Sequence, residues 1–403
     1  MSREAPPKSL TIDASDIAVD EKTQYRYSEL DGLRGIASLL VGLNHGITIP
    51  LVITATLAGV PIVNALAGVI NGAISVDLFF IMSGFFLCGM LASNSIHNLS
   101  SYYIRRYIRL IPPAIVSILI LYIFVKTSLQ NDSKYPEASM DYLLYYADNK
   151  IITAKTFALN ILFIHHTINP VLWTIREEIL VSSIFPLVYF IKNLFSFWWY
   201  RTAWLIIYLF IAVLLKHHQS LGLDIFHYLY MFYAGAMIRD YASQIRRLPV
   251  NLQYFLCFAA VAGLIIIGEL IPTYGRHRII FDVPVIVFGS MLIILLSHGT
   301  IPAIRKVLNT RSLQFLGRIS YSFYLMNWVF VIGTAQVLMQ TRMVTYIGAL
   351  GTGLLLTFIS TILNLYAANW FYIAIERQAV RWSRYFGIIA YNASNTRPIH
   401  KPT

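Results

Sequence analysis

Long apolar segments alternate with short polar ones along most of the chain. A helix that crosses a membrane needs about 20 predominantly apolar residues, with a working range of roughly 17–25. Ten segments approach that length and composition: 33–51, 74–92, 108–126, 176–192, 203–216, 222–238, 252–271, 281–298, 319–339 and 345–367. The pattern predicts an all-α, polytopic integral membrane protein with about ten transmembrane helices.

The segments between and beyond these spans complete the expected organisation. Residues 55–71 are apolar but are interrupted by Pro61 and two glycines, which is typical of an interfacial or re-entrant piece on the outer side. Residues 127–155 are the longest polar stretch and are expected to form an outward loop. Three parts are expected: a disordered cytosolic tail at 1–28 without a cleavable signal peptide, a transmembrane domain at 29–376, and a basic cytosolic tail at 377–403. No separate soluble domain is expected.

Composition favours lipid as the main solvent. Of the 403 residues, 57% are hydrophobic and 12% are charged, whereas a soluble domain has about 45–50% apolar and roughly 25% charged residues. These polar side chains are too few to cover the surface of a fold of this size in water. Most helices are therefore expected to face lipid.

The distribution of positive charge predicts the orientation. With a cytosolic N-terminus, 21 of the 31 Lys and Arg residues fall on the inner side and 8 on the outer side, while Arg34 and Arg176 lie at span ends. Lys and Arg accumulate in cytosolic loops, so both termini are expected in the cytosol. The net charge of +12 does not indicate nucleic acid as a partner, because the cations form no single basic stripe.

The first predicted span carries Arg34 and, eleven residues further on, His45. On a helix the two lie about 20° apart around the axis and about 16 Å apart along it. A histidine at that depth needs a polar partner or a water-filled cavity and is a functional-site candidate, although it can also simply hydrogen-bond a neighbouring helix. Arg34 is either a ligand-binding cation or a snorkelling anchor.

Carboxylates enter two other spans. A buried carboxylate needs a partner, so Asp77 is expected to orient an imidazole or a substrate hydroxyl, or to cap its helix. Ser83 and Gly84, further along the same span, offer a small face where another backbone can approach closely. The adjacent Glu177 and Glu178 follow Arg176 and either form a simple ion pair with it or supply one carboxylate, facing the interior, for general acid/base chemistry.

Three arginines, Arg105, Arg106 and Arg109, follow the second span on the inner side. Guanidinium groups donate hydrogen bonds in pairs, which suits the phosphates of a cytosolic cofactor. Binding of anionic lipid is the alternative.

No metal site or disulfide framework is expected. The pairs His165-His166 and His217-His218 show no metal-ligand spacing with a carboxylate, and the two cysteines lie in apolar runs.

Six short blocks occur in the order found in the acyltransferase 3 family, whose members are integral-membrane O-acyltransferases of bacterial surface sugars. They are Arg34-x10-His45, SVDLFFIMSGF at 75–85, Arg-Arg-x-x-Arg-x-x-Pro at 105–112, Trp173 with Glu178 and Pro186, GRISYSFYL at 317–325, and IER at 375–377. The chain resembles this family over about residues 28–384. It departs from the pattern at Asn327, where many members have an ionisable His, and in WTI at 173–175, where the family has WSL.

The resemblance implies transfer of an acyl group, most often acetyl, from cytosolic acyl-CoA to a hydroxyl of a cell-surface or lipid-linked saccharide at the bacterial cytoplasmic membrane. His45 is then expected to be the general base, oriented by Asp77 or Glu178. The residues expected to bind the acyl-CoA are Arg34, Arg105, Arg106 and Arg109, and those expected to contact the acceptor are Ser83, Trp173 and Asn327.

A transporter or flippase of a saccharide or lipid-linked intermediate is the alternative function, because intramembrane ionisable residues and interrupted apolar segments also mark transport paths. The lack of two similar halves in the sequence counts against it. The residues leave several acceptors open, among them O-antigen, exopolysaccharide, capsule, peptidoglycan, a lipo-oligosaccharide and a secreted small molecule. The acyl group and the oligomeric state are open as well.

Overall fold

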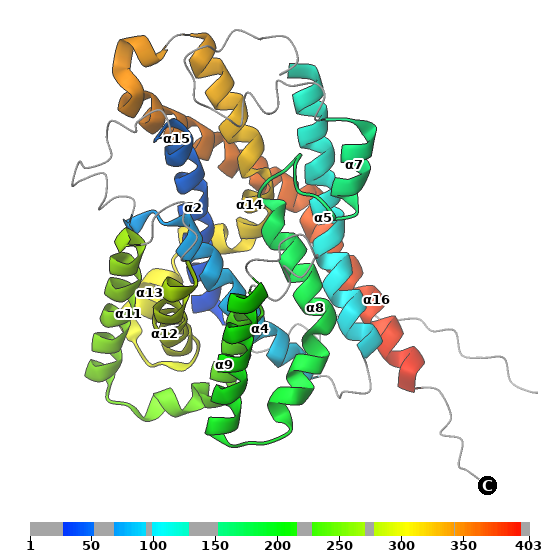
Figure 1. The fold of residues 1–403 in the computed structure, drawn as a ribbon, viewed down its shortest axis with the longest axis vertical. Helices are drawn as coiled ribbons and strands as arrows, with labels where there is room; N and C mark the ends of the chain where they lie inside the picture. Colours follow the sequence, from blue (N-terminus) through cyan, green and yellow to red (C-terminus); the bar gives the residue numbers. More distant parts are fainter. Residues whose placement is uncertain are drawn as a thin grey trace, which may run out of the picture.

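The computed structural model of the chain describes residues 27–51, 68–93, 99–128, 152–215, 228–270, 278–341 and 343–395. Within these ranges every regular element is helical (Figure 1): α2 (Ser28–Leu51), α4 (Gly72–Ser93), α5 (Leu99–Ser128), α7 (Ala154–Ile161), α8 (Leu172–Asn193), α9 (Trp198–Leu215), α10 (Leu229–Tyr241), the 3-10 helix η4 (Ala242–Arg247), α11 (Val250–Leu270), α12 (Arg278–His298), α13 (Pro302–Leu308), α14 (Arg311–Gln340), α15 (Met343–Phe371), the π-helix η5 (Tyr372–Glu376) and α16 (Arg377–Asn395).

Among the described residues, seven helical segments are long and apolar enough to cross a membrane: Gly72–Ala92, Leu99–Thr127, Trp198–Leu215, Val250–Leu270, Phe281–His298, Arg311–Leu338 and Gly351–Ala393. The prediction of an all-α, polytopic membrane protein is therefore confirmed. The other three predicted spans correspond to α2, α8 and α10. Helix α10 has only 13 residues, whereas α2 and α8 are long but carry polar side chains such as Arg34, His45 and Glu178. Most of the apolar piece predicted at 55–71 lies outside the described residues.

Large apolar side chains cover the outside of several helices. Phe258 on α11 is 73% exposed and Trp370 on α15 is 67% exposed. Many large apolar side chains exposed in this way mark contact with an apolar environment, which in a polytopic protein is the lipid.

Helix α2 packs against α14, α15 and α4. Its contact with α14 leaves no room for side chains, because a Cβ on Gly35 would lie 2.7 Å from the backbone nitrogen of Gly317. Lipid supplies no hydrophobic driving force between helices, so such close backbone packing is the main source of helix association in membranes.

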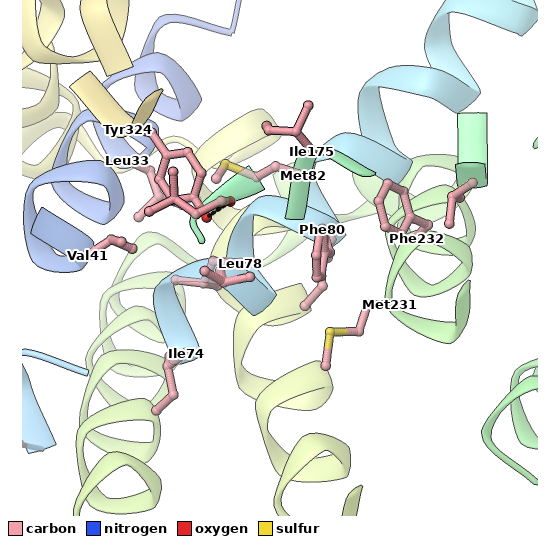
Figure 2. Packing of buried hydrophobic residues seen from close by; sticks show 14 of the residues in the cluster. Leu33, Val41, Ile74, Leu78, Phe80, Met82, Ile175, Met231, Phe232 and Tyr324 are labelled. Carbon is pink, nitrogen blue, oxygen red and sulfur yellow. Dashed lines mark hydrogen bonds between the residues drawn. The ribbon is translucent and has the colours of Figure 1, made fainter. Parts of the chain in front are cut away.

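Helices α4 and α10 cross at an even shorter distance. A Cβ on Gly84 would lie 1.8 Å from the carbonyl oxygen of Phe232, and a Cβ on Gly235 would lie 1.9 Å from that of Ile81. Figure 2 shows Phe80 and Phe232 among the apolar side chains packed around this part of the bundle. The close approach expected at Gly84 from the sequence is present.

Helix α8 begins inside the protein, beside the middle of α5. The two helices are antiparallel, since Tyr102 contacts Ser182 while Ser117 contacts Asn169, and α5 continues for eleven residues, about 16 Å, beyond Ser117. The irregular backbone before α8 is stabilised by Asn169, whose Nδ2 donates to the carbonyl oxygen of Leu325 at 3.2 Å. Non-helical backbone at this depth is tolerated where protein groups satisfy its hydrogen bonds.

Residues 377–395, part of the segment expected as a basic tail, form α16, which continues α15 through η5 and packs along α5. The Ser101 hydroxyl donates to the carbonyl oxygen of Gly387 at 2.8 Å. Gly387 also lies against Arg105, because a Cβ there would be 2.4 Å from the Arg105 Cγ.

The α4–α10 crossing gives a prediction about stability. Substitution Gly84→Ala should lower the free energy of unfolding by about 1–3 kcal/mol, the usual range for overpacking, because the methyl group meets a backbone carbonyl that cannot move alone. Thermal unfolding of the purified protein in detergent measures the effect. The matched control is Gly333→Ala, where the nearest atom to the new methyl is a Phe124 ring carbon at 3.2 Å. Equal stability of the two variants would contradict the packing described here.

Candidate functional site

A buried ion pair joins α5 and α8 in the interior. The Arg106 Nη2 donates to Glu178 Oε1, and the two side chains are only 10% and 18% exposed. The same carboxylate oxygen accepts a hydrogen bond of 2.9 Å from the Ser83 hydroxyl on α4. The Arg106 Nε also donates to the Ser182 hydroxyl at 3.0 Å. A charge in such surroundings is tolerated because it is paired and also hydrogen-bonded to a neutral group.

Tyrosines of α5 fix the two helices in register around this pair. The hydroxyls of Tyr102 and Tyr103 each donate to a backbone carbonyl of α8, at Ser182 and Ser183, over 2.9 Å. The Tyr107 hydroxyl lies 2.8 Å from the Ser183 hydroxyl. The register of α5 and α8 is therefore set by polar contacts on both sides of Arg106.

Arg109 and Arg34, two more of the arginines predicted from the sequence, form one group of charges with the Arg106–Glu178 pair. Arg109 interacts electrostatically with Arg34, Arg106, Glu178 and Glu376. Its side chain is exposed and makes no hydrogen bond or ion pair with the described residues. It is therefore available to bind an anion.

Arg34 reaches this group from α2. Its guanidinium lies 5.2 Å from the centre of the Phe86 ring and 3.9 Å from the Asp31 carboxylate. Because that ion pair is long and the side chain is 23% exposed, Arg34 can also bind an anionic ligand.

Glu376 is a member of the group that we did not expect from the sequence. It is buried at the end of η5 and accepts hydrogen bonds from the backbone N–H and the hydroxyl of Ser322 on α14. Its charge acts on Arg109 and Arg34. Single π-helical turns inside long helices occur frequently at functional sites, but this one is not visible in the apolar pattern of the sequence.

His45 has a partner on α14. Its Nδ1 lies 2.8 Å from Oδ1 of Asn327, and its ring meets that of Trp328 edge-on at 5.4 Å. Asn327 is buried, with 2% exposure. The Asn327 amide oxygen faces Nδ1, so a proton on Nδ1 would leave the lone pair of the half-buried imidazole on Nε2.

The partner of His45 is thus an amide, where the sequence led us to expect Asp77 or Glu178. Glu178 is instead bound by Arg106 and Ser83. Asp77 is fully buried on α4 and acts electrostatically on Tyr230 of α10.

Tyr230 in turn joins a second acid, because its hydroxyl donates to Asp282 of α12 at 2.5 Å. Asp77 therefore belongs with the contacts between α4, α10 and α12.

The remaining predicted residues are divided between the site and its surroundings. Arg105 packs against Gly387 of α16. Trp173 is half-buried, with its ring 6.1 Å from that of Phe80 and 5.3 Å from that of Tyr228.

The two adjacent glutamates of α8 are both held by arginines. Glu177 is buried and pairs with Arg176 at 3.3 Å, whereas Glu178 pairs with Arg106. The two carboxylates therefore serve different contacts, as adjacent positions on a helix require.

No group of three His, Cys, Asp or Glu side chains that could hold a metal ion occurs among the described residues. What the described geometry offers is a set of guanidinium groups for an anion and, about 16 Å along α2 from Arg34, an imidazole in contact with the Asn327 amide.

Comparison with known proteins identifies a family for the chain. Neither a curated protein nor a solved structure matches the chain significantly. A family model described as an acyltransferase domain, that of the acyltransferase 3 family, matches residues 27–369. The matched region begins one residue before α2 and ends near the end of α15, so it contains every residue of the site except Glu376. The chain therefore belongs to the acyltransferase 3 family, and it is a multi-pass membrane acyltransferase.

Proposed function

We propose that this acyltransferase moves an acyl group, acetyl in the first instance, from cytosolic acyl-CoA to a hydroxyl of a cell-surface or lipid-linked saccharide. The observation that carries the proposal is the arrangement on α2. One end of this helix contributes Arg34 to a group of guanidinium charges, and its other half holds His45 against Asn327.

The guanidinium groups suit the donor. The phosphates of acyl-CoA are bound by Arg34 and Arg109, because Arg109 makes no ion pair among the described residues and Arg34 makes only a long one. Arg106 is held by Glu178. It adds positive charge to the site without binding the phosphates itself. Glu178 and Ser83 act by positioning Arg106. The pantetheine arm then extends along α2 and carries the thioester toward His45.

His45 is the general base. Its Nε2 removes the proton from the acceptor hydroxyl while the oxygen attacks the thioester carbonyl carbon. The carbon–sulfur bond then breaks, and the CoA thiolate receives the proton from the imidazolium. Asn327 holds the tautomer that leaves Nε2 free to accept, which is the role that a carboxylate or amide has in other acyl-transfer sites.

The acceptor is a saccharide, and Trp173 is the residue proposed to contact it, because its half-buried ring lies between α4 and the start of α10. The site lies in the bacterial cytoplasmic membrane with the arginine end inward. This orientation follows the excess of Lys and Arg on that side and agrees with a cytosolic donor.

Removing the imidazole tests the assignment of the base. Substitution His45→Ala should reduce acylation of the surface saccharide by about 10²–10⁴-fold, the usual contribution of a general base. The measurement is mass spectrometry of surface glycans from cells that carry only the variant, at equal protein abundance. His165→Ala, an exposed histidine before α8, is the control and should acylate normally. Normal acylation by His45→Ala would remove the base from the mechanism.

A matched pair of arginines tests the binding of the donor. Arg109→Gln should raise the KM for acetyl-CoA by about tenfold or more, because hydrogen bonds to charged groups contribute roughly 1.5–3 kcal/mol. Arg105→Gln, which changes the same charge on the same helix, should alter KM little. Acetyl-pantetheine, which lacks the nucleotide phosphates, should be used equally by wild type and Arg109→Gln. Steady-state kinetics in proteoliposomes compares them, and equal effects of the two substitutions on acetyl-CoA would exclude Arg109 as the phosphate ligand.

The amide of Asn327 gives a third test. Asn327→Leu removes the acceptor of the Nδ1 proton and should lower kcat with little change in the KM for acetyl-CoA, since the donor's phosphates bind elsewhere. Asn327→Asp keeps an oxygen at the same place and should restore much of the rate. Loss of activity in both variants, with protein folded as judged by thermal unfolding, would show that Asn327 acts only through packing.

A further inference from the structure

An open groove lies where α14 begins beside α15. It has a volume of about 450 Å³ and is lined by Arg311, Ser312, Phe315, Leu316 and Leu365. Its wall is formed mostly by the three apolar side chains, while Arg311 and Ser312 are exposed at the first turn of α14. None of these residues belongs to the site described above.

The polar side of the groove is positively charged. Arg318 follows Arg311 by seven residues, so both lie on one face of α14 about 10 Å apart along the axis. Both are exposed, and neither makes a hydrogen bond or ion pair with the described residues. The Arg318 guanidinium lies 5.7 Å from the centre of the Phe315 ring. The sequence contains no acidic residue between Asp282 and Glu376.

The position of the groove fits the zone where a membrane changes from headgroups to acyl chains. The start of α14 is tied to the start of α2, because the side chain of Gln314 donates to the carbonyl oxygen of Ser28 at 2.7 Å. On α15, the exposed Tyr366 and Trp370 form the kind of aromatic pair that is enriched at membrane interfaces.

We propose that this groove binds an anionic phospholipid, with its phosphate between Arg311 and Arg318 and an acyl chain along Phe315, Leu316 and Leu365. Charge complementarity selects the headgroup, because two exposed cations favour a lipid with a net negative charge over a zwitterionic one. The apolar wall selects an amphiphile over free phosphate. This site is independent of the proposed transfer reaction.

Native mass spectrometry of the protein, purified in detergent with added phosphatidylglycerol or phosphatidylethanolamine, tests the proposal. The double variant Arg311→Gln/Arg318→Gln should retain less phosphatidylglycerol, by about fivefold for each arginine, and should retain phosphatidylethanolamine as the wild type does. The control Arg247→Gln/Arg381→Gln loses the same charge from exposed positions on η4 and α16 and should retain phosphatidylglycerol normally.

A second variant tests the apolar part of the site. Leu365→Trp fills the groove, keeps both arginines and should also lower retention of phosphatidylglycerol, with folding checked by thermal unfolding. Inorganic phosphate at millimolar concentration should not displace the lipid. Equal losses in the control double variant would show diffuse charge attraction, and displacement by phosphate would show an ion site without an acyl chain. Either result would overturn the proposal, as would unchanged retention in Arg311→Gln/Arg318→Gln.

Discussion

A guanidinium and a carboxylate lie paired inside a bundle whose outer surface is apolar, and this constrains the helices that carry them. Arg106 and Glu178 cannot be separated without leaving a charge in a medium of low dielectric constant, which costs several kcal/mol. Helices α5 and α8 must therefore keep their antiparallel register, and α4 must keep Ser83 within hydrogen-bond distance of the carboxylate. The tyrosines of α5 support the same register through the backbone of α8.

The Arg106–Glu178 pair determines where the other charged side chains of the site lie. With Arg106 held, Arg109 lies one helical turn further along α5, and its charge meets Arg34 from α2 and Glu376 from η5. Glu376 enters because the π-helical turn at the end of α15 lets the chain continue into α16 while Ser322 binds the carboxylate. Four separate stretches of the chain thus contribute to one group of charges, and none of them could form it alone.

The position of the His45 imidazole depends on the contact between α2 and α14. Helices α2 and α14 approach closely at Gly35 and Gly317, and further along the same contact Asn327 reaches His45. An amide in this place does not ionise in the physiological range, so it can only hydrogen-bond the ring. The position that departs from the family pattern is therefore the one that contacts this imidazole.

The sequence by itself determined the membrane class, the helical fold, the family, and the stripe that places Arg34 and His45 on one face of α2, because apolar length and helical periodicity are local properties. It also indicated the small face at Gly84. Only the tertiary structure decided that Asn327, and neither carboxylate, contacts His45, that Glu376 joins the arginines, and that Arg105 packs on α16 while Arg109 remains available. These contacts join residues tens to hundreds of positions apart in the chain. Such contacts are set by how helices cross, and a single sequence does not indicate which helix faces meet.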